Sequence, residues 1–250
     1  MAAPVTSFGD MKSQLAAFMR RDMSEFVVNG VDLLSKAVYR ARTYAQQKHD
    51  FEVCRCAVTI PSMSIANGAL LSTAVRYGTT EPVSVKAIEA AFLPVPVQGS
   101  STNVLVPIEN TMRSQHRRRL SEHFGRIMSD SATRQAYSPL TLSTYSLVRH
   151  GDMIYLRPAD VEISGGSDTF DLHCDAVVWA DTYASDADTD FFLTYGESFI
   201  LFRGVVELNL FLKDSEQVQV STAAMKDAWE ALISCDTMML KNVTSDFNLQ

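Results

Sequence analysis

The segment SFILFRGVVELNLFLKD at 198–214 is the most apolar part of the chain, and it constrains the fold more than any other feature. A membrane span needs about 20 mostly apolar residues, but this segment is shorter and carries Arg203 and Glu207 near its middle. A strand is also disfavoured, because the segment exceeds normal strand length and lacks strict alternation. In a helix, Arg203 and Glu207 share one narrow stripe. We therefore predict a helix that other elements cover over most of its surface.

Further helices are predicted on both sides of this segment in the sequence. The residues that follow it favour a helix from about 216 to 239, and the short link at 213–215 is typical of an αα-hairpin. Near the N-terminus, apolar residues recur at helical spacing over 31–48 and predict an amphipathic helix. A shorter helix is expected at 11–20. These helices can cover the apolar segment.

The middle of the chain gives a more mixed pattern. The segment FEVCRCAVTIP at 51–61 predicts a strand that stops at Pro61, because proline cannot donate to a sheet ladder. A short helix is predicted at 85–91. A longer one is predicted over PIENTMRSQHRRRLSEHFGRIM, where Pro107 suits a first helical turn.

The segment 137–183 is rich in β-branched and aromatic residues and predicts three or four antiparallel strands, with turns at 150–152 and 164–167. Together these elements predict an α+β fold, in which a helical bundle formed by the N- and C-terminal helices carries an attached antiparallel β module. We expect a single domain, 1–250, with these approximate parts: the bundle at 10–60 and 190–240, the β module at 137–183, and a variable insertion at 61–136.

The composition is that of a soluble globular protein, with 46% apolar and 20% charged residues among 250. The net charge of −7 is unevenly distributed. Residues 160–250 hold 17 acidic and 4 basic side chains, a net of −13, whereas the remainder holds 12 acidic and 18 basic ones, a net of +6. The four cysteines lack metal-finger spacing and are expected to be reduced. The N-terminus shows no secretory signal, so we expect synthesis and folding in the cytosol.

An acidic loop precedes the apolar segment. Asp186, Asp188, Asp190 and Glu197 occupy positions 1, 3, 5 and 12 of a calcium-binding EF-hand pattern, but Phe191 stands where that turn requires glycine. A solvated loop whose carboxylates cap and complement the next helix is therefore favoured over a calcium site. We expect neither a metal nor a cofactor here.

Patterns for catalysis and metal binding are weak. The sequence contains no G-x-S-x-G, P-loop, G-x-G-x-x-G or H-E-x-x-H motif. His49, Asp50 and Glu52 could suggest a metal site, but they join a helix end to a strand start, where histidine suits the negative helix terminus. We therefore expect no enzymatic activity and no catalytic residues.

Three segments carry a resemblance to a known family: LLSKAVYRARTYAQQKHDFE, RHGDMIYLRPADVEI, and VVWADTYASDADTDFFLTYGESFILFRGVVELNLFLKDSEQVQVSTAAMKDAWEALISCD. In these segments the chain resembles the head-to-tail adaptor proteins of tailed bacteriophages, which are also called connector, neck or tail tubular protein A. The resemblance touches both ends of the chain and about two thirds of its length. Its motifs are loose patterns rather than catalytic residues.

The resemblance implies a structural protein of the virion neck, between capsid and tail. Copies would form a ring, a dodecamer in this reading, beneath the portal protein and above the tail tube or nozzle protein. Double-stranded DNA would pass through the channel without sequence-specific binding. The acidic loop with Asp186, Asp188 and Asp190 would face the channel or a partner, since carboxylates repel phosphates.

One basic cluster, RSQHRRRLSEHFGR, contains Arg113, Arg117, Arg118 and Arg119. It can form a solvated helical surface, dock to an acidic portal surface, or contact the DNA backbone.

Two other functions remain open. A tail-tube or tail-terminator subunit would be mostly β, which the helices predicted at 198–239 disfavour. A cytosolic α/β enzyme would need a site that the motifs do not reveal.

Overall fold

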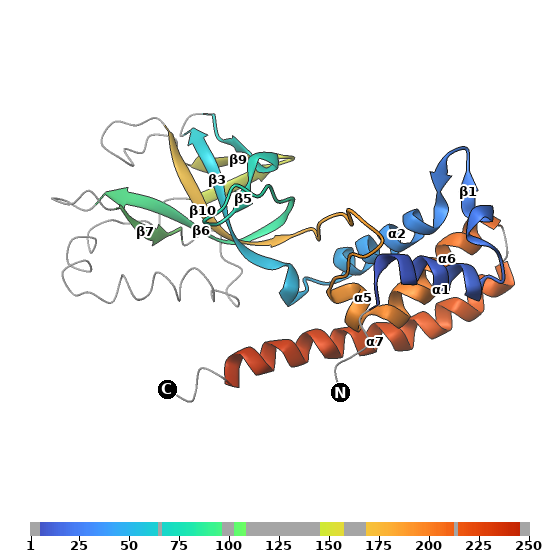
Figure 1. Ribbon diagram of the computed structural model, residues 1–250. Coiled ribbons are helices and arrows are strands. Elements are labelled where there is room, and N and C mark those ends of the chain that lie inside the picture. The colour runs from blue at the N-terminus through green and yellow to red at the C-terminus, as the bar shows by residue number, and fades with distance from the viewer. Residues whose placement is uncertain are drawn as a thin grey trace. The chain divides into compact units, whose positions relative to one another are not determined.

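The computed structural model describes residues 6–64, 67–96, 103–108, 146–157, 169–212 and 215–245. It confirms the α+β fold class (Figure 1). The chain divides into two compact units, a helical unit formed by 1–53 with 181–250, and a β unit formed by 54–180. Both ends of the chain thus contribute to one unit, and the middle of the chain forms the other.

The helical unit is built around one central helix, α6, which packs against α1, α2, α5 and α7. Its elements are α1 (Phe8–Phe18), η1 (Met23–Phe26), β1 (Val27–Val28), β2 (Val31–Asp32), α2 (Leu33–Lys48), α5 (Phe191–Tyr195), α6 (Glu197–Leu212) and α7 (Ser215–Ser245). Strands β1 and β2 pair as a small antiparallel hairpin. The helix predicted from the apolar segment at 198–214 is therefore confirmed.

Helix α6 is buried along most of its length, as its sequence predicts. Phe199, Ile200, Val205 and Leu208 are almost completely inaccessible to solvent. Even Glu207 is buried, and it pairs with Arg203 four residues earlier on the same helix. Among the described residues, no helix is long and apolar enough to cross a membrane.

Local polar contacts fix where three of the helices begin. Ser7 and Asp10 form a capping box at the start of α1. The carboxylate of Asp32 accepts from the backbone N–H groups of Leu34 and Ser35 at the start of α2. Asp190 caps α5 in the same way. These side chains satisfy N–H groups that have no partner inside the helix.

The β unit holds two antiparallel sheets. Its elements are η2 (Glu52–Cys54, beginning in the helical unit), β3 (Arg55–Ser64), β4 (Ala69–Leu70), η3 (Leu71–Thr73), β5 (Val75–Arg76), β6 (Val85–Pro96), β7 (Asn103–Pro107), β8 (Ser146–His150), β9 (Met153–Arg157) and β10 (Thr169–Val178). One sheet has the order β5-β3-β10-β6-β7, and the other has the order β4-β9-β8. Residues from both sheets, including Ile60, Ile154 and Leu172, share one hydrophobic core.

The sequence predictions for the middle of the chain need correction. Residues 85–91 begin strand β6 rather than a helix, and β6 pairs with β10 and β7. Strand β3 also continues beyond Pro61. The register with β10 shifts beside this proline, and the Ser62 backbone N–H donates to the Asp171 carboxylate at 3.0 Å. A β-bulge therefore accommodates the proline.

The predicted division of the chain also differs from the observed one. The range 10–60 predicted for the bundle includes the first residues of strand β3, 55–60, yet β3 belongs to the five-stranded sheet. Strands β4 to β7 lie within the predicted variable insertion at 61–136, but they supply part of the sheets and core of the β unit. The turn predicted at 150–152 is confirmed between β8 and β9. The turn at 164–167 lies outside the described residues, as does nearly all of the helix predicted from Pro107, which itself ends β7.

Candidate assembly site

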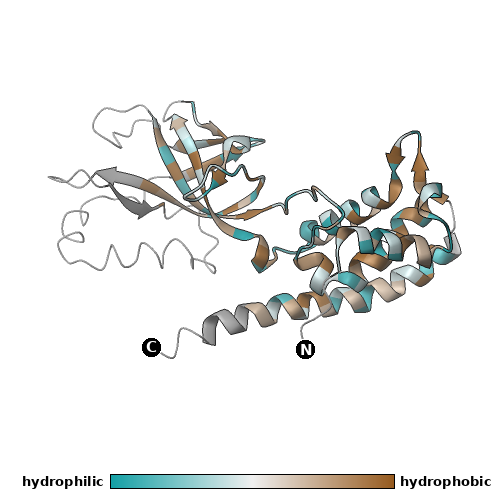
Figure 2. Ribbon diagram, viewed as in Figure 1, coloured by the Kyte–Doolittle hydropathy of each residue, from teal (hydrophilic) through white to brown (hydrophobic). Residues whose placement is uncertain are grey.

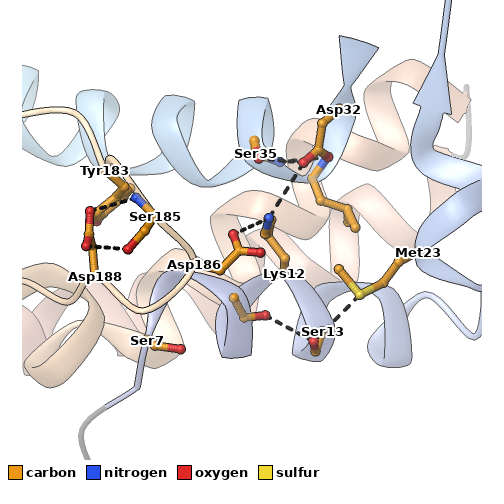
Figure 3. A network of polar contacts seen from close by, with 12 residues as sticks. Ser7, Lys12, Ser13, Met23, Asp32, Ser35, Tyr183, Ser185, Asp186 and Asp188 are labelled. Carbon is orange, nitrogen blue, oxygen red and sulfur yellow. Dashed lines mark hydrogen bonds and ion pairs between the residues drawn. The ribbon is translucent and has the colours of Figure 1, made fainter. Parts of the chain in front are cut away.

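The acidic loop predicted from the sequence joins β10 to α5, and each of its three aspartates has intramolecular partners. Figure 3 shows the partners of Asp186 and Asp188. Asp186 lies 2.5 Å from the Lys12 ammonium of α1, although its own side chain is 66% exposed. The Lys12 side chain is only 10% exposed and also lies 3.8 Å from Asp32. This lysine therefore connects the loop, α1 and the start of α2.

The backbone of the loop also lies against the start of α1. The N–H groups of Phe8 and Gly9 donate to the carbonyl groups of Asp188 and Asp186, each at 2.8 Å. A Cβ atom at Gly9 would lie 2.9 Å from the Cβ of Asp186. A side chain at position 9 would therefore force α1 and the loop to shift apart.

Asp188 stabilises the loop from within. Its carboxylate accepts from the Ser185 hydroxyl at 2.7 Å and from the Ser185 backbone N–H at 3.0 Å. The backbone N–H of Ala184 donates to it as well. These hydrogen bonds to the charged form lower the pKa of Asp188, with the Ser185 hydroxyl as the largest cause.

Asp190 joins the loop to α2 through a largely buried arginine. Its carboxylate lies 3.0 Å from Arg42 Nη1, and the Tyr183 hydroxyl donates to it at 2.8 Å. The Arg42 guanidinium also lies over the Tyr183 ring, 4.4 Å from its centroid. Burial raises the pKa of Tyr183, and the negative charge of Asp190 raises it further. The tyrosine is therefore a neutral donor at physiological pH.

These contacts give the acidic loop a structural role as a connection between α1, α2 and α5. Among the described residues, no group of three or more metal-binding side chains could hold an ion. Asp190 accepts from the Leu193 backbone N–H and so caps α5, a short helix that the sequence did not predict, rather than the helix predicted at 198–214. The expected role of the loop toward a channel or partner stays a prediction, which rests on the exposed Asp186.

His49, which the sequence suggested as a helix-terminal residue rather than a metal ligand, forms a contact between two helices. His49 ends α2, and its Nε2 lies 2.9 Å from the buried Asp236 carboxylate, which also accepts from the Glu52 backbone N–H at 2.8 Å. This histidine thus connects α2 to α7.

The basic cluster with Arg113, Arg117, Arg118 and Arg119 lies outside the described residues. All four cysteines are free thiols, and burial raises the pKa of Cys174.

The β1–β2 hairpin, the end of α1, the end of α6 and the beginning of α7 lie toward one end of the helical unit, and these elements carry exposed apolar side chains (Figures 1 and 2). We call this group the apolar end, and each side chain in it is at least 41% exposed. Its members are Phe18, Met23, Val27, Val28, Leu210, Phe211, Leu212 and Val220. Isolated exposed apolar residues are ordinary, but a group of them is typical of a protein–protein interface.

Ring contacts hold part of the apolar end in place without covering it. The Phe18 ring packs edge-on against Phe202 of α6, with ring centroids 6.0 Å apart. The Arg40 guanidinium of α2 lies 5.4 Å from the centroid of the Phe211 ring. Arg40 also lies 3.3 Å from the Glu207 carboxylate. The end of α6 is therefore tied to α2 while three consecutive apolar residues, Leu210–Leu212, face solvent.

Sequence reasoning did not identify this surface or the partners of the acidic loop. For α6, the three consecutive apolar residues Leu210–Leu212 were an available signal, because adjacent residues point in different directions around a helix. Lys12 and Arg42 lie more than 140 residues from their partners Asp186 and Asp190. No local pattern connects residues at such a separation.

Neither a scan against protein-family models nor a search of curated proteins gave a match to this chain.

Proposed function

We propose that this protein is a structural subunit of the virion neck of a tailed bacteriophage, a head-to-tail adaptor that forms a ring beneath the portal protein. The observation that carries the proposal is the apolar end of the helical unit. Side chains such as Val27, Leu210 and Phe211 would be shielded from water by a neighbouring copy or by the portal. Such burial is favourable at about 25 cal/mol per Å² of apolar surface.

A ring requires two different surfaces on each copy that fit one another and close by rotation. The apolar end supplies one such surface on a unit whose core is otherwise complete. The longest of the three segments that resemble adaptor proteins covers the acidic loop, α5, α6 and most of α7, and it includes Leu210–Leu212 and Val220 of this surface. The partners in this proposal are the portal, the tail tube or nozzle protein, other copies of the chain, and the DNA in the channel.

The uneven charge of the chain supports a channel role. The net charge of −13 over residues 160–250 would repel the phosphates of passing DNA, so that DNA moves without sticking. The arginine cluster at 113–119 is proposed to contact the portal or the DNA backbone. Both roles follow from charge alone, and neither involves a chemical reaction.

The proposal is tested by measuring the mass of the purified full-length chain by native mass spectrometry, alone and mixed with the portal protein of the same phage. A ring that forms on the portal supports an adaptor. A chain that never binds the portal would contradict it.

A variant pair locates the contact. Leu210→Glu places a charge in the apolar end, where the side chain is 58% exposed, and is expected to prevent ring formation while the chain still folds. Val148→Glu is the matched control, because Val148 is also exposed but lies on β8 of the β unit. Equal loss of the ring in both variants would exclude the apolar end as the specific contact.

A further inference from the structure

A groove with a volume of about 740 Å³ lies within the helical unit, apart from the apolar end. Tyr44 and Lys48 of α2 contribute to one wall, and Ala223, Lys226 and Trp229 of α7 contribute to the other. The lining also includes Phe199 of α6, which is itself almost inaccessible to solvent. Helix α6 packs against both α2 and α7, so it forms the floor of a groove between these two helices.

Aromatic contacts hold the walls of this groove in place. The Trp229 ring packs against Phe199 with centroids 5.2 Å apart, and its edge meets Phe51 at 6.2 Å. On the opposite wall, the Arg203 guanidinium lies 4.3 Å from the centroid of the Tyr44 ring. A groove with fixed walls can bind without first ordering its own side chains, which lowers the entropic cost of binding.

The length of the groove along α7 suits an α-helix. The lining residues of α7 run from Gln219 to Trp229, which at about 1.5 Å per residue corresponds to roughly 15 Å of groove. An amphipathic helix of about three turns spans this length. Its apolar stripe would lie on the partly exposed Tyr44 and Trp229 and on the exposed Ala223, in the way that helices bind hydrophobic grooves of other proteins.

The positive charges of the groove lining favour an acidic partner helix. Lys48 and Lys226 are exposed and lie on opposite walls, and the lining contains no acidic side chain. Lysines on both sides of an apolar floor complement carboxylates on both sides of an apolar stripe. We propose that this groove binds an acidic amphipathic helix of a partner protein, with its apolar stripe on the groove floor and its carboxylates beside Lys48 and Lys226.

The chemistry of the floor argues against nucleic acid as the occupant. Phosphate backbones bind rows of basic side chains, whereas the two lysines here flank an apolar surface formed by Tyr44, Ala223 and Trp229. The proposal does not depend on the adaptor proposal, since an acidic helix can bind this groove in a protein with any assembly role.

The experiment uses the full-length chain with Trp179→Phe, which leaves Trp229 as the only tryptophan and as a reporter within the groove. Two synthetic helical peptides of about 14 residues, roughly 20 Å long, carry the same leucine stripe. One has glutamates on both flanks and the other has lysines. We expect the glutamate peptide to change Trp229 fluorescence and to bind at least about tenfold more tightly than the lysine peptide.

Two variants test the groove and a third is their control. Ala223→Arg fills the groove from an exposed position and is expected to abolish binding of the glutamate peptide. Lys226→Glu is expected to remove the preference for that peptide. Lys36→Glu makes the same change of charge on the exposed face of α2 outside the groove, and is expected to preserve both affinity and preference.

Several results would overturn the proposal. These are equal affinity for both peptides, no binding of either peptide, or unchanged binding to Ala223→Arg. Displacement of the glutamate peptide by a DNA duplex would identify nucleic acid as the occupant instead. Self-association of the chain that Ala223→Arg abolishes would instead identify a second copy as the occupant.

Discussion

The Arg42 guanidinium lies 3.0 Å from the Asp190 carboxylate and links the middle of α2 to the first turn of α5. The Arg42 side chain is 5% exposed, so the carboxylate is a partner for a charge that water scarcely reaches. Because Asp190 also ends the acidic loop, this pair fixes the path of the chain as it re-enters the helical unit from β10.

Asp190→Asn tests the pair separately from the helix cap. Asparagine can still accept from the Leu193 backbone N–H, but it removes the negative charge beside Arg42. We expect a loss of about 2 to 3 kcal/mol in the free energy of unfolding, measured by urea denaturation, since Asp190 itself is partly exposed. Asp181→Asn, at an exposed position in the same loop, is expected to change stability by less than about 0.5 kcal/mol. Equal effects of the two changes would refute the importance of the pair.

Gly68 in the β unit should not tolerate any side chain. Its φ is +75°, and a Cβ atom there would lie 2.0 Å from the Ile154 carbonyl oxygen. Gly68→Ala is therefore expected to destabilise the protein by more than about 3 kcal/mol, because backbone strain and a clash act together. Gly78 has a φ of +76° with open space around it, so Gly78→Ala is expected to cost only about 1 kcal/mol. Thermal unfolding of both variants measures the difference, and similar losses would contradict the clash.

His173 is expected to make the β unit less stable in mild acid. Burial lowers its pKa below the ordinary value of 6.5, and Asp171 opposes that shift. Below pH 6.5 the unfolded chain then binds more protons than the folded one. The free energy of unfolding therefore decreases as the pH is lowered from 6.5 to the pKa of the folded state. His173→Asn, which can keep a polar contact to Thr59, is expected to reduce this slope. Urea denaturation between pH 7.5 and 5 measures it, and an unchanged slope would exclude His173 as the cause.

Asp236 should contribute to stability through two contacts from one buried carboxylate. It is 2% exposed, and it meets the His49 ring and the Glu52 backbone N–H. Asp236→Ala removes both contacts and is expected to cost about 2 to 3 kcal/mol in urea denaturation. Asp236→Asn keeps one acceptor and is expected to cost less. A larger loss of stability for Asp236→Asn than for Asp236→Ala would contradict the importance of the retained acceptor.

The sequence predicted the helices well because their signals are local. In α6, Arg203 and Glu207 lie four residues apart, and this spacing favours a helix over a strand, while their charges disfavour a membrane span. The prediction failed at 85–91, where alanine, lysine and glutamate favour a helix but pairing with β10 and β7 determines a strand. It failed again at Pro61, since a bulge that accommodates a proline depends on the partner strand.

The candidate site was less accessible to sequence reasoning. The acidic loop was identified, but its partners Lys12 and Arg42 come from the other end of the chain. The apolar end combines β1 with the ends of α1, α6 and α7, and only the fold brings these segments into one unit. Surfaces built from distant segments have no pattern within a short window of sequence.

The central claim, that the protein is a neck adaptor, is tested most directly by electron microscopy of virions that carry a labelled copy of this chain. We predict a ring of label between the capsid and the tail, directly beneath the portal. Label along the tail tube, or virions without any label, would contradict the claim.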